Sequence, residues 1–212
     1  NNPAILDSCG VVVALDGMSR QAMHGLPSTA IAEKQAVLAF SGCACLLRTA
    51  ALEQTGLFDE RFFAYCEDTD LSLRILRAGW NIITVQDAKV IHFYSKTGGA
   101  FSLQKLFWIE RNHYWVALKN FPALLLAALP FVTAWRFICL MYALTDKHNR
   151  ISGFVSGNGG LNVAMTILRA NVAAVGGTMP VIKTRISMKK NLRRTNTEML
   201  GLLMHRHASM IE

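Results

Sequence analysis

The sequence predicts an α/β region followed by an α-helical, membrane-associated region. Apolar runs typical of buried strands alternate with helix patterns over residues 1–120, where 11 Lys and Arg balance 11 Asp and Glu. Residues 121–212 contain long apolar stretches and carry 11 Lys and Arg against 3 Asp and Glu, so the whole net charge of +8 lies there. We therefore expect two parts, 1–120 and 121–212, with different surroundings.

The first part is expected to contain short strands and helices separated by turns. Apolar runs predict strands over residues 11–15, 35–47, 81–85 and 89–92, and helical spacing predicts helices over 50–55, 71–78 and 103–120. Thr49 is a candidate N-cap, and Gly56 and Gly79 are natural helix stops. Residues 18–34 are expected to form a loop.

Three carboxylates, Glu67, Asp68 and Asp70, precede the helix expected over residues 71–78. Like charges packed this closely repel, so one of them is expected to have a raised pKa, as a general base requires. Acidic residues at a helix N-terminus are also ordinary caps that the helix dipole favours. Spacing alone does not separate these two interpretations.

The second part is predicted to associate with a membrane. Residues 121–145 carry one charge, Arg136, and are long enough to span a bilayer, which takes about 20 apolar residues. Pro130 would kink this helix and Arg136 is costly at mid-bilayer, so a single span and a hairpin within one leaflet both stay open. Residues 152–160 are expected to be a linker, and 161–175 to form an amphipathic helix at the interface.

Six Lys and Arg residues lie between positions 183 and 194. Each could contribute about 1 kcal/mol at an anionic membrane surface, although a solvated basic tail is the simpler alternative. A nucleic-acid patch is disfavoured because no aromatic residues are interleaved for stacking, and we expect no nucleic-acid partner. The final residues, through His205 and His207, are expected to be poorly ordered.

Several motifs follow one another in a characteristic order along the first part. They are Phe40–Arg48, Gly56–Phe63, Glu67–Leu71, Arg77–Trp80 and Val90–His92. In this order they resemble the second half of a family 2 glycosyltransferase domain of the bacterial rhamnosyltransferase-like type. The resemblance covers roughly Ile5 to Pro122, and it implies a GT-A fold with a mostly parallel sheet. The nucleotide-binding half would precede Asn1, so we expect the chain to be a fragment.

The resemblance also implies an activity and a location. Members of the family transfer a sugar, with inversion, from a nucleotide-sugar donor to an acceptor, here a lipid-linked or other glycan in bacterial surface polysaccharide synthesis. This would take place at the cytoplasmic face of the inner membrane, and five cysteines without a CxxC pair fit a reducing cytosol. A membrane-bound partner or relic without catalytic activity stays open, because the donor-binding carboxylates would come from the other half.

The resemblance implies roles for seven residues. Asp68 would be the general base, and Glu67 would orient the acceptor or the base. His92 would serve a Mg²⁺ or Mn²⁺ ion, although a histidine at a strand end is often structural. The substrate-binding candidates are Ser41, Gly42, Asp70 and Arg111. These too have structural alternatives: a bend at Ser41-Gly42, a helix anchor at Asp70 and an interfacial cation at Arg111.

Overall fold

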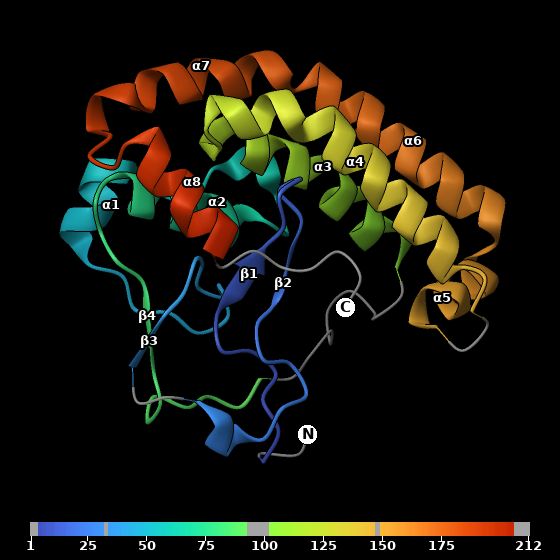
Figure 1. Cartoon of the computed structure of the whole chain (residues 1–212), viewed down its shortest axis with the longest axis horizontal. Coiled ribbons are helices and arrows are strands. Elements are labelled where there is room, and N and C mark those ends of the chain that lie inside the picture. Colours follow the sequence, from blue (N-terminus) through green and yellow to red (C-terminus); the bar gives the residue numbers. More distant parts are fainter. Residues whose placement is uncertain (1–3, 32–33, 93–101, 147–148, 206–212) are drawn as a thin grey trace.

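The computed structural model describes residues 4–31, 34–92, 102–146 and 149–205, and shows a helix-rich chain with two small sheets (Figure 1). Helices form an arch along one side, and the strands lie beneath it, towards the N-terminus. The strands are β1 (Val11–Val13), β2 (Ser19–Gln21), β3 (Lys34–Ala36) and β4 (Ile83–Val85). The helices are α1 (Thr49–Thr55), α2 (Glu67–Arg77), α3 (Leu103–Asn120), α4 (Ala123–Ala143), α5 (Arg150–Asn158), α6 (Gly160–Gly176), α7 (Thr178–Met188) and α8 (Asn196–His205).

Both strand pairs are antiparallel, whereas the resemblance implies a mostly parallel sheet. Strand β1 pairs with β2 with Val12 opposite Arg20, and β3 pairs with β4 with Gln35 opposite Thr84. Strand β2 lies within the stretch that the sequence predicts to be a loop. Within the described residues the strands total four short segments, and residues 89–92 form none.

The strand predicted over residues 35–47 ends early because its backbone finds other partners. Phe40 donates its N–H to the Ser72 hydroxyl at 3.1 Å, and Ala44 turns back to the carbonyl of Ser41 at 3.2 Å. Gly42 donates its N–H to a carboxylate rather than to a strand. The apolar part of this run, residues 37–40, is nevertheless buried between β1 and β4, with its backbone bonded to both sides.

Helix α3 coincides with the predicted helix over 103–120, and α1 and α2 also lie where the sequence predicts helices. The predicted N-cap of α1 is wrong, because Thr49 is already helical and Arg48 occupies the cap position. Helix α2 starts earlier than predicted, at Glu67, and Gly79 follows its end with φ of +93°.

Two predictions for the second part are wrong. The expected linker over 152–160 is mostly helix α5, whose start is capped by the Asn149 side chain on the N–H of Ile151 at 2.9 Å. The expected disorder near the C-terminus is helix α8 as far as His205, while His207 lies outside the described residues. A capping box between Thr195 and Glu198 starts α8, with reciprocal bonds of 2.7 and 3.2 Å.

One apolar core contains residues from both predicted parts, and the boundary at 120/121 falls between α3 and α4. Phe62 and Val116 from the first part share this core with Val181, Met199 and Leu203 from the second, and all five are buried almost completely. Helix α3 contacts α2, α6 and α7. The last helices therefore stabilise the position of α3 and, through it, of α2.

The Asp70 network is a set of buried polar side chains that joins α2 to α3. The carboxylate of Asp70 is fully buried and accepts hydrogen bonds from Arg74 at 2.9 Å, Lys119 at 2.8 Å and Asn120 at 2.8 Å. Lys119 also bonds Asp59 at 2.7 Å. Because a buried charge is costly unless it is paired, these groups fix the two helices relative to each other.

We predict that Asp70→Asn lowers the free energy of unfolding by about 3 kcal/mol, because the variant leaves Arg74 and Lys119 buried without their shared carboxylate. Denaturant-induced unfolding measures the loss. The exposed Asp87→Asn is the matched control and should change stability by less than about 0.5 kcal/mol. Equal stability of the two variants would contradict the structural role of the network.

Candidate active site

The site is built where the turn after residues 37–40 meets the N-terminus of α2. The backbone N–H of Gly42 donates to Asp68 Oδ2 at 2.9 Å, and the N–H of Thr69 donates to Asp68 Oδ1 at 2.7 Å. A Cβ atom at Gly42 would lie 3.5 Å from the Asp68 side chain, an ordinary contact. Two backbone donors thus orient one half-exposed carboxylate, and the Gly42 motif and the Glu67-Asp68 motif meet in space.

Glu67 differs from Asp68 in its surroundings. Its Oε2 atom is buried and has no hydrogen-bond partner among the described residues. Burial raises the pKa of the Glu67 carboxyl above its ordinary value, and the adjacent charge of Asp68 raises it further. The prediction that one of the three carboxylates has a raised pKa is confirmed at Glu67, with burial rather than repulsion as the larger cause.

The loop that leads into the carboxylates has an unusual backbone. Phe63, Tyr65 and Cys66 have φ values of 64°, 66° and 67°, in the left-handed region that side-chain-bearing residues rarely adopt. Such a conformation persists only where the surrounding structure enforces it. The polarity pattern of this stretch does not predict the strain.

Two neighbouring side chains of α3 enforce that conformation; we call them the α3 clamp, Arg111 and Asn112. Asn112 is fully buried and donates to the carbonyls of Phe62, Ala64 and Tyr65 at 3.0, 2.9 and 2.7 Å. Arg111 donates to the carbonyls of Arg61 at 3.1 Å and Phe62 at 2.9 Å. Arg111, a predicted substrate-binding residue, thus holds the loop, and sequence reasoning gave Asn112 no role.

The other candidates lie in different settings. Asp70 follows Thr69 in α2, but its side chain belongs to the buried Asp70 network. This position agrees with the structural alternative, in which Asp70 anchors the helix and does not bind substrate. Ser41 is next to Gly42, and its Oγ lies 3.2 Å from the Sγ of Cys43. Ser41 therefore remains at the site, whereas Asp70 faces away from solvent.

His92 pairs with an acidic residue that sequence reasoning did not single out. Its Nδ1 lies 2.6 Å from Asp7 Oδ2, and the Nδ1 of His24 lies 2.9 Å from the Asp7 carbonyl. In the described ranges there is no group of three or more His, Cys, Asp or Glu side chains arranged to hold a metal ion. Asp7 and His92 alone do not make a complete Mg²⁺ or Mn²⁺ site, which needs several oxygen ligands, so the divalent ion stays a prediction.

Comparison with known proteins defines the class. Residues 17–175 match the family described as Glycosyl transferase family group 2. The match includes the Gly42–Asp68 contact, the α3 clamp and His92. This chain belongs to that glycosyltransferase family.

Two curated relatives come from strains CDC 1551 and H37Rv of Mycobacterium tuberculosis. Both are named N-acetylglucosaminyl-diphospho-decaprenol L-rhamnosyltransferase, and each is 44% identical to this chain over 59 residues. The aligned segment covers 28% of this chain and only 19% of each relative. No solved structure matches the chain.

We predict that Glu67→Gln raises the melting temperature at pH 7 but not at pH 4. A carboxyl whose pKa is raised in the folded state adds stability below its ordinary value of 4.5, and this stability is lost as the pH rises through the folded-state pKa. Glutamine cannot ionise, so the variant avoids the free-energy cost of charging the buried carboxyl, and its gain in melting temperature over wild type should grow with pH. Melting curves of Glu67→Gln and of the exposed control Glu53→Gln measure this gain. A gain that is independent of pH would contradict the prediction.

Proposed function

We propose that this chain supplies the catalytic base of an inverting glycosyltransferase with a GT-A domain. The observation that carries the proposal is the contact between Gly42 and Asp68, which orients a solvent-accessible carboxylate next to a second, partly buried one. A carboxylate in this position can take a proton from an acceptor hydroxyl. Membership of the glycosyltransferase family supports this use of the pair.

In the proposed reaction Asp68 removes the proton of the acceptor hydroxyl as its oxygen bonds to the anomeric carbon of the donor sugar. The bond from that carbon to the diphosphate breaks, its electron pair leaves with the nucleoside diphosphate, and Asp68 carries the proton away. Glu67 lies one residue earlier in α2 and orients the acceptor. A Mg²⁺ or Mn²⁺ ion would neutralise the departing diphosphate.

The relatives suggest the chemical class of the substrates. Their name describes transfer of rhamnose to N-acetylglucosamine carried on a polyprenyl diphosphate. We propose that this chain acts on an acceptor of the same class, with a nucleotide-linked hexose or deoxyhexose as donor. The product would extend a lipid-linked glycan for the bacterial cell surface.

We predict that Asp68→Asn in the full-length protein lowers the transfer rate at least about 100-fold, because general base catalysis contributes typically 10²–10⁴-fold. The amide keeps an oxygen that can accept the Gly42 bond, so the fold should survive. Transfer of radiolabelled sugar to a polyprenyl-diphosphate N-acetylglucosamine acceptor measures the rate.

The exposed Glu60→Gln is the control and should leave the rate within about twofold, since surface changes are usually tolerated. An Asp68→Asn variant with most of the wild-type rate would overturn the assignment of the base. A wild-type protein that binds donor and acceptor without transfer would favour the non-catalytic alternative.

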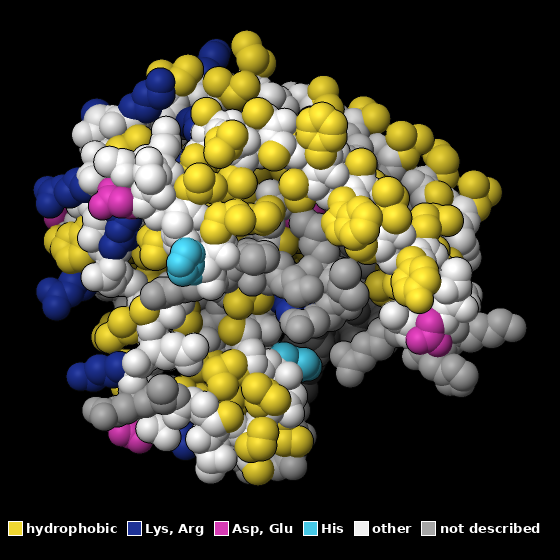
Figure 2. Space-filling model, in the orientation of Figure 1, with side chains coloured by type: hydrophobic (Ala, Val, Ile, Leu, Met, Phe, Trp, Pro, Cys, Tyr) yellow, Lys and Arg dark blue, Asp and Glu magenta, His cyan; other side chains and the backbone are white. Residues whose placement is uncertain are grey.

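We also propose that the helical arch lies on the cytoplasmic face of the inner membrane. Helix α4 is long and apolar enough to cross a bilayer, and only 6% of its most apolar window is buried. Figure 2 shows hydrophobic side chains gathered over the arch. The arch surface consists of exposed apolar residues at helical spacing on α4 and α6, namely Leu124, Phe131, Trp135, Ile138 and Tyr142, with Leu161, Met165, Leu168, Val172 and Val175.

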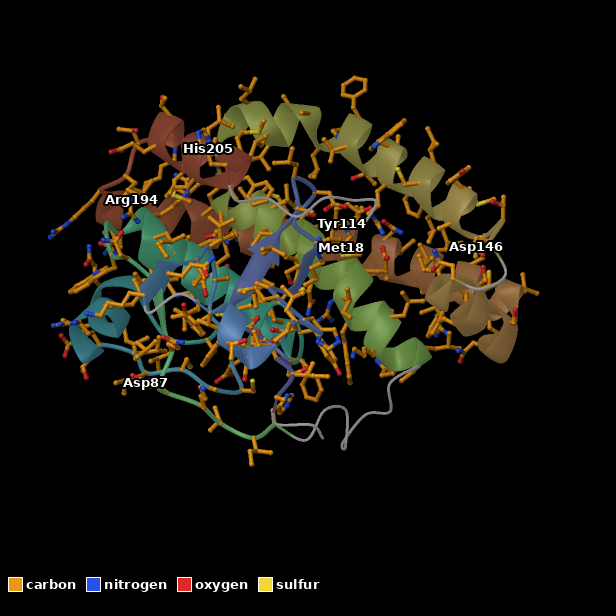
Figure 3. All side chains as sticks on the ribbon, turned by 60° about the horizontal axis from the view of Figure 1, so that its bottom comes forward. Met18, Asp87, Tyr114, Asp146, Arg194 and His205 are labelled. Atoms are coloured by element: carbon orange, nitrogen blue, oxygen red, sulfur yellow. The ribbon has the colours of Figure 1, made fainter. Side chains whose placement is uncertain are left out.

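The single charge of α4 turns away from this surface. Arg136 donates to both carboxylate oxygens of Glu110 on α3 at 2.9 Å and lies 2.9 Å from Asp16 Oδ2. In Figure 3 the labelled Met18 and Tyr114 mark the region where the turn that contains Asp16 meets α3. The pairing compensates the charge inside the protein, so Arg136 need not face lipid.

Two of the six basic residues between positions 183 and 194 form hydrogen bonds within the fold. Arg185 donates to the carbonyls of Leu118 at 2.8 Å and Phe121 at 2.6 Å, at the end of α3. Arg194 donates to the carbonyls of Leu76 at 2.5 Å and Trp80 at 2.6 Å, at the end of α2. The exposed basic residues are Lys183, Lys189, Lys190 and Arg193. Figure 2 shows Lys and Arg side chains gathered at one end of the arch.

We predict that the double variant Lys189→Ser/Lys190→Ser weakens binding to vesicles that contain phosphatidylserine by about 25-fold, since each basic residue near an anionic surface contributes about 1 kcal/mol. Vesicle co-sedimentation measures the change. Lys34→Ser, an exposed lysine on β3, is the control and should bind normally. If both variants bind anionic vesicles as strongly as they bind neutral ones, the contact with the membrane is not electrostatic.

A further inference from the structure

Phe63 is an exposed aromatic residue on the loop that leads into the carboxylate pair. It leaves 75% of its surface accessible, while the adjacent Phe62 is fully buried in the core. The two phenylalanines belong to one sequence motif, yet one is exposed and the other is buried in the structure. Phe63 lies four residues before the start of α2, and its ring adds little to the buried core.

Phe63 belongs to an aromatic platform, which we define as Phe63, Tyr65 and Trp108. The rings of Phe63 and Trp108 lie 5.0 Å apart at 45°, and those of Tyr65 and Trp108 lie 6.2 Å apart and nearly parallel, at 29°. The ammonium of Lys105 lies 5.2 Å from the centre of the Tyr65 ring. One charged group, Lys105 on α3, therefore borders the platform.

The platform is held rigidly in place. Two of its residues, Phe63 and Tyr65, have left-handed backbone conformations, and the α3 clamp bonds to the carbonyls on both sides of Phe63. Trp108 comes from the same helix as the clamp. Strained backbone that is enforced in this way is typical of ligand sites.

We propose that the platform is the subsite for the acceptor sugar, an inference that rests on the proposed function. The C–H groups on one face of a pyranose ring carry partial positive charge and would stack on the negative faces of the aromatic rings. Tyr65 precedes Asp68 by three residues, so a sugar stacked on the platform would be bound on the loop that leads into the proposed base. A lipid contact fits less well, because the exposed apolar residues of the arch surface lie on other elements, α4 and α6.

The test compares Phe63→Ala, Trp108→Ala and the control Phe58→Ala in the full-length protein. Phe58 is another partly exposed aromatic residue of the same region, outside the platform. Kinetic measurements give kcat and the KM for the donor and the acceptor. Saturation-transfer NMR with methyl N-acetylglucosaminide, the sugar of the proposed acceptor, gives binding without any turnover.

We expect Phe63→Ala to raise the acceptor KM about fivefold, the factor that roughly 1 kcal/mol of lost aromatic contact corresponds to. The donor KM should stay unchanged, the NMR signal of the glycoside should fall, and Phe58→Ala should behave as wild type. Because Phe63 is exposed, its replacement should leave the melting temperature near that of wild type.

An unchanged acceptor KM in Phe63→Ala, with active wild-type protein, would overturn the platform and leave the proposed function intact. Loss of vesicle binding in Phe63→Ala without a change in acceptor KM would assign the platform to the membrane and also overturn it. If the wild-type protein shows no transfer, the proposed function fails. The NMR signal then decides the platform alone: a signal lost in Phe63→Ala supports it, and no signal from wild type overturns it.

Discussion

The buried carboxylate of Asp70 is the constraint on which the site depends. It sits in α2, two residues after Asp68, and its partners Lys119 and Asn120 end α3. An isolated buried charge costs several kcal/mol, so these groups stay together. The start of α2 is thereby fixed relative to α3, and Asp68 can meet the N–H of Gly42 only while that position holds.

Helix α3 connects the remaining parts through polar side chains that point inward. Its Glu110 holds Arg136 of α4, its Asn112 holds the strained loop, and the indole of Trp115 donates to the carbonyl of Ala174 on α6 at 3.0 Å. One helix therefore joins the carboxylate site to the arch surface. If the arch lies on a membrane and the acceptor is lipid-linked, as proposed above, this connection would hold the carboxylate site at a fixed height above the bilayer.

The sequence predicted this helix and the carboxylate pair, but not how α3 is oriented. Apolar periodicity located α2 and α6, although the recurring apolar residues are buried in α2 and exposed on the arch surface in α6. The same reasoning treats polar residues as exposed, so it could not predict that Asn112 and Lys119 are buried, since their partners are distant backbone carbonyls and carboxylates. Helix α5 was missed because glycine and serine suggest a linker, and α8 was missed although the Thr195–Glu198 capping box is visible in the sequence.

The anomeric configuration of the product tests the central claim most directly. If Asp68 activates the acceptor hydroxyl for a single displacement, NMR of the product formed by the full-length protein should show a configuration opposite to that of the donor sugar. Retention would require a covalent intermediate or another path for the departing group. A retained configuration would therefore contradict the role of Asp68 as a base.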